Sequence, residues 1–210
     1  MTQGDAPRHA MAFVDGQNLF QHAMAAFGHH HPNFDPVKLH AAVCAAHGWT
    51  PTLVRFYTGV PHEDHAPMWA GYWNNRVLAL KRAGVNVTTR RLRYSREKVT
   101  HPDGTIEHRH IPKEKGIDIR LALDLVKCAR TGQFDVAVLF SQDQDLAEAV
   151  DEARAVAREH GRRVTFCCAY PHGPRATSRR GVDRTEWFRM DEAFYNRCLD
   201  PRDHRPRQWR

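Results

Sequence analysis

One segment of the chain reads FDVAVLFSQDQD, residues 134–145, and joins a short apolar run to two carboxylates. The run from Asp135 to Phe140 is short enough for one fully buried strand. Asp143 and Asp145 follow, and apolar residues then recur at helical spacing from Leu146 to Ala157. The acids therefore lie in a strand-to-helix turn, where open parallel sheets bind their ligands. A plain helix start is the alternative, because Asp also caps helices well.

The same pattern occurs near the start of the sequence. Ala10–Val14 is a short apolar run that ends in Asp15, and Gly16, Gln17 and Asn18 come before the next helical pattern. This segment is more polar than a turn requires, although an ordinary Asp-Gly turn is the alternative. A second carboxylate is thus expected at the carboxyl end of a buried strand.

A third carboxylate stands out in the helical pattern KEKGIDIRLALDLVKCART, residues 113–131. On a helical wheel with about 100° per residue, Asp118 lies in the middle of the apolar stripe. A carboxylate on the core side of a helix is costly unless it is paired or binds a cation. Asp124 lies at the edge of the polar face, near Arg120 and Lys127. The wheel therefore favours Asp118 for chemistry and ranks Asp124 lower, as an ordinary surface acid.

A basic hairpin is expected between these segments. The strand Val85–Thr89 leads into basic residues interleaved with Tyr94, the turn Pro102–Gly104 follows, and Ile106–Ile111 forms the returning strand. The basic residues are Arg90, Arg91, Arg93, Arg96 and Lys98. Basic and aromatic side chains on an exposed hairpin suit single-stranded nucleic acid, and a solvated charged face is the alternative.

Further patterns predict helices at 36–47 and 66–83 and strands at 53–57 and 163–169. The aromatic stripe of the second helix, Trp69, Tyr72 and Trp73, is expected to pack in the core. Residues 171–210 are rich in Arg and Pro. Trp187, Phe188 and Phe194 suggest a short helix packed on the domain, with the last ten residues loosely attached.

Length and composition predict one globular domain at residues 1–170 with an Arg-rich extension at residues 171–210. The 210 residues are 41% hydrophobic and 26% charged, and the net charge of +7 favours an anionic partner. No apolar run approaches the roughly 18 residues that span a membrane, and we expect no signal peptide. The 5 cysteines lack paired spacing, which suits reduced thiols in a cytoplasm.

Strands that alternate with helices predict a mostly parallel sheet with right-handed crossovers. Such a fold can bring Asp15, Asp118 and the Asp143–Asp145 turn into one crevice. Clustered carboxylates repel unless they hold cations, and all-oxygen ligation suits Mg²⁺ or Mn²⁺. A metal there can activate water for phosphate ester hydrolysis, and the basic residues would attract a polyanion. We expect Asp15, Asp118 and Asp143 within reach of one ion, and Ala10–Val14 beside Val136–Phe140.

Three blocks resemble the signatures of NYN domains, which are PIN-like nucleases also called LabA-like or DUF88. The blocks are FVDGQN at 13–18, KGIDIRLALDLV at 115–126 and LFSQDQDL at 139–146, in the family's order over roughly residues 10–170. The resemblance implies a PIN-like three-layer α/β/α sandwich with a central, mostly parallel sheet. It also implies a ribonuclease that depends on Mg²⁺ or Mn²⁺.

The resemblance also implies roles for single residues. Asp15, Asp118, Asp143 and Asp145 would form the catalytic and metal-ligating cluster, with Asn18 as its polar neighbour. Ser141 would line the turn and Lys115 would lie near the phosphate, beside the candidate substrate-binding residues Arg90, Arg91 and Arg93. Asp124 matches an acid common in the family. The third block departs from the family's Ser-Gly-Asp-x-Asp-aromatic pattern at Gln142 and Leu146, and Gln142 would restrict the turn if it requires a positive φ.

The partner implied is RNA, expected to be single-stranded, with no membrane and with a homo-oligomer left open. The alternative to a ribonuclease is an RNA-binding or regulatory module with little or no catalysis. An unrelated phosphotransfer enzyme is the third interpretation. The sequence contains no GxxxxGK[ST] or GxGxxG motif, which argues against nucleotide binding through those loops.

Overall fold

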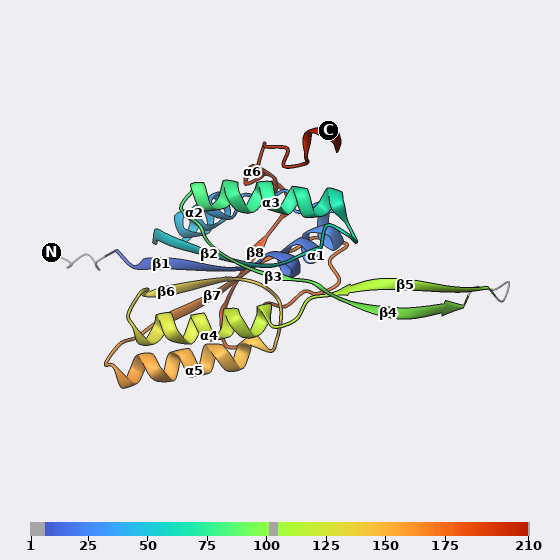
Figure 1. Cartoon of the computed structure of the whole chain (residues 1–210). Coiled ribbons are helices and arrows are strands. Elements are labelled where there is room, and N and C mark those ends of the chain that lie inside the picture. Colours follow the sequence, from blue (N-terminus) through green and yellow to red (C-terminus); the bar gives the residue numbers. More distant parts are fainter. Residues whose placement is uncertain (1–6, 101–104, 210) are drawn as a thin grey trace.

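The computed structural model describes residues 7–100 and 105–209 and shows strands and helices that alternate along most of the chain (Figure 1). In chain order the elements are β1 (His9–Asp15), α1 (Gly16–Phe27), α2 (Pro36–His47), β2 (Thr50–Val60), α3 (Pro67–Arg82), β3 (Asn86–Arg91), β4 (Arg93–Thr100), β5 (Ile106–Lys113), α4 (Ile117–Arg130), β6 (Val136–Phe140), α5 (Leu146–Glu159), β7 (Thr165–Pro171), β8 (Glu186–Met190), α6 (Glu192–Arg197) and the 3₁₀ turn η1 (Arg207–Trp209).

The central sheet has 6 strands in the order β3-β2-β1-β6-β7-β8. Every neighbouring pair in it is parallel. Helices α1, α2, α3 and α6 cover one face, and α4 and α5 cover the other (Figure 1). The chain therefore has the expected α/β/α sandwich, with a sheet that is parallel throughout.

Alternate side chains of β1 supply two separate cores, as the pleat of a strand requires. Ala10, Ala12 and Val14 pack with α1, α2 and α3. Met11 and Phe13 pack with α4 and α5. Both faces of β1 are thus apolar, which explains why its sequence reads as a continuous run rather than an alternation.

The order of the strands reverses between β1 and β6. From β1 the chain moves outward to β2 and β3, and it then returns to the other side of β1 to form β6 and β7. Val14 pairs with Phe140 in this central contact, so the expected adjacency of the two strands is confirmed. Their carboxyl ends meet at the topological switch point, where sheets of this class form a binding crevice.

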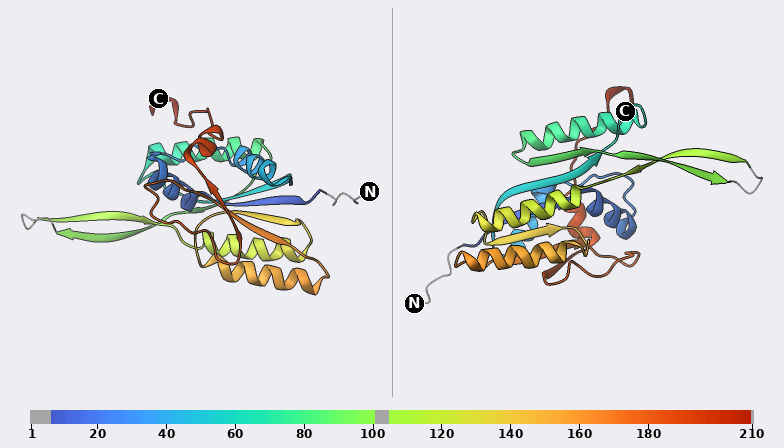
Figure 2. Two further views of the ribbon diagram at one scale, coloured as in Figure 1. Left: turned by 180° about the vertical axis from the view of Figure 1, so that it is seen from behind. Right: turned by 60° about the horizontal axis from the view of Figure 1, so that its bottom comes forward.

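Strands β4 and β5 form a separate antiparallel hairpin that projects from the body of the molecule (Figures 1 and 2). The hairpin was predicted, but its base lies further along the chain than expected. Arg90 and Arg91 end β3, and β4 begins at Arg93. The expected turn at Pro102–Gly104 lies outside the described residues.

The carboxyl-terminal segment completes the fold instead of resting loosely on it. Trp187 and Phe188 lie in β8, which pairs with β7, and not in the short helix expected there. Residues 201–209 contact α3, where the Asn75 side chain donates a hydrogen bond of 3.0 Å to the carbonyl of His204. Strand β8 shows no apolar run because it is an edge strand in which, of its 5 residues, Met190 is the buried one.

No helix of the described residues is long and apolar enough to cross a membrane. The five cysteines are unpaired and buried, as expected. Burial raises the pKa of the Cys167 and Cys168 thiols to about 12, so both are protonated at neutral pH. They act as small apolar groups of the core.

Candidate functional site

Asp15 lies where β1 ends and α1 begins. Its side chain caps the helix by accepting a hydrogen bond of 3.0 Å from the Asn18 amide. The helix can start this close to β2 because residue 16 is glycine: a Cβ there would lie 2.5 Å from the Phe56 ring. Only 6% of Asp15 is exposed. The Asp-Gly pair is therefore both a helix start and a means of holding a carboxylate at the sheet edge.

The electrostatic surroundings of Asp15 disfavour its negative charge. Burial is the main cause that raises the pKa of Asp15 to about 6, and the charges of Asp143 and Asp118 add to it. Hydrogen bonds from the backbone of Asn18 and Gln17 act in the opposite direction. Asp15, Asp118 and Asp143 all line one cavity, which is consistent with this repulsion.

Asp143 is held by a network of hydrogen bonds in the loop after β6. Its backbone amide donates to the Ser141 hydroxyl at 3.2 Å, and its carboxylate accepts from the Asp145 amide at 3.1 Å. The Asn18 side chain accepts a hydrogen bond of 2.9 Å from the Gln142 amide. Asn18 thus ties the start of α1 to the loop that carries Asp143, and fixes the spacing between Asp15 and Asp143.

Gln142 does not strain this loop. Among the described residues, Arg184 is the non-glycine residue with a positive φ, so the turn needs no glycine at position 142. The Gln142 side-chain amide donates a hydrogen bond of 2.8 Å to the carbonyl of Arg180, and the Gln144 side-chain amide donates one of 2.9 Å to that of Gly181. The two glutamines therefore dock the segment before β8 onto the acidic loop. Leu146 is buried in the core between α4 and α5.

A fourth carboxylate, Glu114, joins the site between β5 and α4. It accepts a hydrogen bond from the backbone amide of Gly59. Burial raises the pKa of Glu114 to about 7, and the charges of Asp15 and Asp118 contribute in the same direction. Glu114 was not predicted, because KEKG reads as a solvated charge run. The sequence feature that could have indicated its role is its position four residues before Asp118.

The helical-wheel prediction for α4 was wrong about its two acids. Asp118 is exposed in the first turn of the helix, and Asp124 is buried. The buried stripe contains Ile117 and Cys128 together with Asp124, so it is centred further from Asp118 than the wheel assumed. Asp118 can stay solvated because the first turn borders the open end of the sheet.

Asp124 has a structural role in a buried polar cluster. It accepts hydrogen bonds of 3.0 Å from the Tyr57 hydroxyl and 2.8 Å from Arg120, and it lies 3.5 Å from the guanidinium of Arg55. Its charge is one cause, after burial, of the raised pKa of Tyr57. These partners satisfy the carboxylate, so Asp124 is not free for a ligand.

The acidic cavity, with a volume of about 560 Å³, lies at the carboxyl ends of β1 and β6. The predicted residues that line it are Asp15, Asn18, Arg90, Arg93, Lys115, Asp118 and Asp143, and Glu114 joins them. Four further candidates do not line it: Arg91, Asp124, Ser141 and Asp145. Ser141 is buried beneath the loop, and Asp145 is exposed beyond it.

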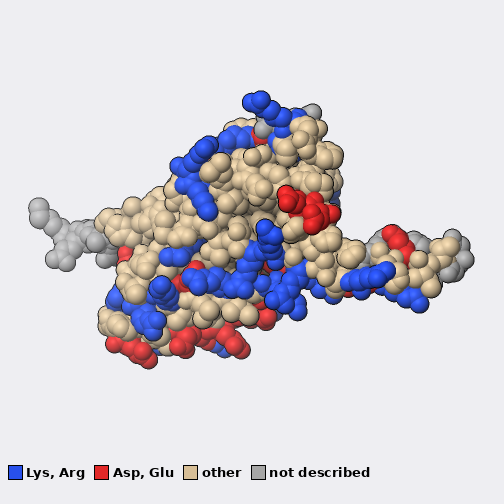
Figure 3. Space-filling view, viewed as in Figure 1, with Lys and Arg blue, Asp and Glu red and all other residues tan. Residues whose placement is uncertain are grey.

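Basic side chains also line the acidic cavity and form its basic wall. Arg90 and Arg93 come from the base of the hairpin, and Lys115 precedes α4. Gly116 has φ 74° and no side chain, which leaves room for the Arg90 guanidinium: a Cβ would lie 3.0 Å from its Nη1. Lys and Arg side chains also gather between α3 and α4 and along the base of the hairpin (Figure 3). The cavity thus offers carboxylates for a cation and cations for an anion.

The four carboxylates are oxygen donors of the kind that Mg²⁺ and Mn²⁺ prefer. Within residues 7–100 and 105–209, no three His, Cys, Asp or Glu side chains are grouped closely enough to hold a metal ion among themselves. The predicted ligands Asp15, Asp118 and Asp143 therefore share a cavity without forming a ready-made three-carboxylate site.

Comparison with known proteins supports the family expectation. The family model described as the NYN domain matches residues 9–186. A solved structure of similar fold is a protein of unknown function, VPA0982, from Vibrio parahaemolyticus RIMD 2210633, with a TM-score of 0.55, 17% identity, and coverage of 92% of this chain and 99% of that chain. MurG of Acinetobacter baumannii aligns with a TM-score of 0.33, 11% identity, and coverage of 87% of this chain and 45% of that chain. This score is too low to indicate a shared fold. No curated protein matches the chain.

Proposed function

The chain belongs to the NYN domain family, and we propose that it is a divalent-metal-dependent ribonuclease that hydrolyses RNA phosphodiester bonds in the acidic cavity. The observation that supports this most is the composition of that cavity. Four carboxylates lie at the switch point of a parallel sheet, facing a basic wall. Metal-assisted phosphate ester hydrolysis requires carboxylates that bind a cation, next to cationic side chains that bind the phosphate.

The donor set fits a hydrated Mg²⁺ or Mn²⁺ ion. Magnesium in proteins is usually held by one or two carboxylates and keeps several waters or substrate phosphates as its other ligands. Asp15 and Asp143, from adjacent strand ends, are the residues that would hold it, with Asp118 and Glu114 acting through waters. When bound, such a cation polarises the phosphoryl oxygens and makes a water more acidic. It would also relieve the repulsion that raises the pKa of Asp15.

The remaining residues bind and orient the substrate in this proposal. Arg90 and Arg93 present planar guanidinium groups, which can each make two parallel hydrogen bonds to a phosphate, and Lys115 adds a point charge. Asn18 is a positioning residue, because its hydrogen bond holds the loop of Asp143. The exposed base of the hairpin would guide a flexible single strand into the cavity.

The test is cleavage of a labelled single-stranded RNA by the purified chain with Mn²⁺ or Mg²⁺. We expect cleavage that EDTA abolishes and that Asp143→Asn reduces by several orders of magnitude. Glu159→Gln is the matched control, because it removes one negative charge from the exposed far end of α5. Wild-type chain that cleaves no RNA with either metal, or cleavage that survives EDTA, would contradict the proposal.

An RNA-binding module with little or no catalysis is the second candidate function. The observation in its favour is that no three potential metal ligands of the described residues are grouped around one point. The basic wall would still attract RNA. Salt-dependent binding of RNA without cleavage, in the presence of either metal, is the result that this alternative predicts.

A further inference from the structure

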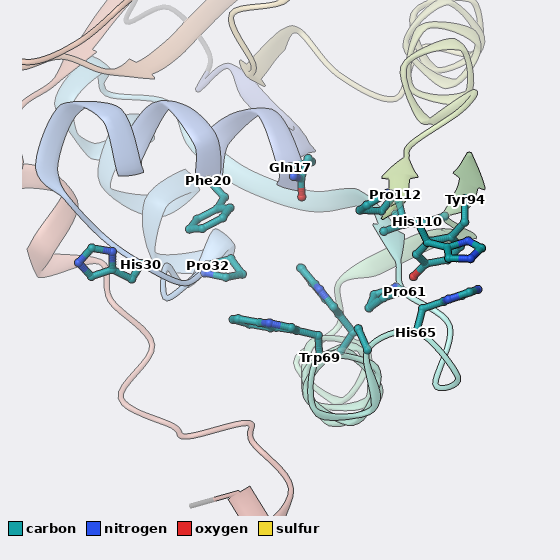
Figure 4. Close-up of a pocket in the computed structure, with 14 residues that line it drawn as sticks. Gln17, Phe20, His30, Pro32, Pro61, His65, Trp69, Tyr94, His110 and Pro112 are labelled. Atoms are coloured by element: carbon teal, nitrogen blue, oxygen red, sulfur yellow. The ribbon is translucent and has the colours of Figure 1, made fainter. Parts of the chain in front are cut away.

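A second cavity of about 340 Å³ lies beside the acidic cavity and has aromatic walls. The aromatic side chains that line it include Phe20, His65, Trp69, Trp73, Tyr94 and His110. Phe20 lies on one side of the space, and His65, Tyr94 and His110 lie on the other, with Trp69 rising from α3 between them (Figure 4). The volume is at the lower end of the range for sites that take small organic groups, about 300–1,000 Å³.

The aromatic side chains of this aromatic cavity are buried in the core to different extents. Tyr72 and Trp73 are buried as the sequence analysis expected, but Trp69 is only half-buried. Trp69 contacts the edge of the Tyr72 ring, with centroids 5.4 Å apart. Trp69 also packs against this core, as expected, but its partly exposed ring forms part of the cavity wall as well.

On the hairpin side, three rings lie in tilted contact with one another. The centroids of His65 and Tyr94 are 3.9 Å apart, and those of His65 and His110 are 5.2 Å apart. The Tyr94 hydroxyl accepts a hydrogen bond from the His62 amide, which fixes the tyrosine ring. An ordered aromatic surface is thus in place without any ligand.

The two cavities adjoin each other through shared and neighbouring residues. Gln17 lines both of them. Gly59 lines the aromatic cavity, while its amide donates to Glu114 in the acidic cavity. Successive residues of a strand point to opposite sides. Accordingly, Arg93 lines the acidic cavity, and its neighbour Tyr94 lines the aromatic one.

We propose that the aromatic cavity binds one base of a single-stranded RNA whose adjoining phosphate lies in the acidic cavity. The placement of the phosphate rests on the function proposed above. Aromatic side chains bind unpaired bases by stacking, and every base offers a flat face for this contact. Gln17, His65 and His110 supply polar groups at the rim for the edge of the base. Bases within a duplex are already stacked and paired, so the cavity selects single strands.

The experiment measures binding to the full chain in EDTA, so that cleavage plays no part. The probes are a short labelled single-stranded RNA and the same strand with abasic nucleotides, which carries equal charge. Wild type should bind the first probe about 5- to 150-fold more tightly, the range that base–aromatic stacking supplies. Trp69→Leu and Tyr94→Leu, which keep apolar bulk, should lose this preference.

Matched variants separate stacking from damage to the fold. Tyr94→Phe keeps the ring and should keep the preference, and Trp209→Ala removes an exposed tryptophan that does not line the cavity. Thermal unfolding shows whether each variant is folded. If Trp69→Leu does not fold, Tyr94→Leu alone tests the loss of the preference. Equal affinity of wild type for both probes, or an undiminished preference in the folded leucine variants, would overturn the inference. A chain that shows the preference but never cleaves RNA would instead refute only the proposed nuclease activity.

Discussion

The substitution Asp15→Asn should stabilise the metal-free protein at neutral and alkaline pH. Asp15 has an ordinary pKa of 3.8 in the unfolded chain, and burial raises the pKa to about 6 in the folded one. The folded state therefore holds this proton more tightly, and its stability falls as pH rises from about 4 to about 6. A shift of about two units corresponds to roughly 3 kcal/mol at pH 8.

The asparagine variant never carries that charge, and its side-chain oxygen can still accept the hydrogen bond from Asn18. Its free energy of unfolding should thus exceed that of wild type by up to about 3 kcal/mol at pH 8 and by little at pH 4. For a chain of this length, the gain corresponds to a Tm rise of roughly 6–12 °C at most. Burial of the amide lowers this value, so several degrees are expected.

The assay is thermal unfolding in EDTA from pH 4 to pH 8, with Glu159→Gln as the control for removing one charge. Asp15→Asn should lose RNA cleavage although its Tm rises. The proposed metal site needs the negative charge of the Asp15 carboxylate, and burial makes that charge unfavourable for folding. A variant destabilised to the same extent at pH 5 and pH 8 would refute the reasoning, since the charge of Asp15 would then not be the source of the penalty.

Three further expectations follow from the site. Added Mn²⁺ should raise the Tm of wild type, and less so that of Asp143→Asn, because binding to the folded state alone stabilises it; equal shifts in a thermal scan would argue against Asp143 as a ligand. Arg90→Ala and Arg93→Ala should each lower the slope of log affinity for RNA against log salt by about one, and Arg91→Ala by less, as measured by anisotropy titrations. Asp124→Ala should cost roughly 1–3 kcal/mol in denaturant unfolding, because it leaves the buried Tyr57 hydroxyl without its acceptor; unchanged stability would contradict the buried cluster.

Periodicity was sufficient to predict most elements of the fold. The strands around Ala12 and Val138 are apolar on both faces because each face supports a core, and their short length favoured strands over helices. Their adjacency followed from the acids at their ends. Strand β8 escaped prediction because short strands at the edge of a sheet carry little apolar pattern of their own.

The site was less predictable, because membership in a cavity depends on tertiary geometry. Asp118 and Asp124 lie on one helix, and an error in the centre of the apolar stripe reversed their predicted burial, although Asp118 does line the acidic cavity. Glu114 lacks a local pattern, and its raised pKa arises from burial and from the charge of Asp15, which is distant in sequence. The position of Trp69 at a cavity wall likewise depends on the hairpin that faces it.

The cation site is tested most directly by anomalous diffraction from crystals of the chain soaked in Mn²⁺. We predict a manganese peak in the acidic cavity, ligated directly by Asp15 or Asp143, and its loss in Asp143→Asn. Crystals that show no manganese there, or that hold it only at a site away from these carboxylates, would contradict the central claim.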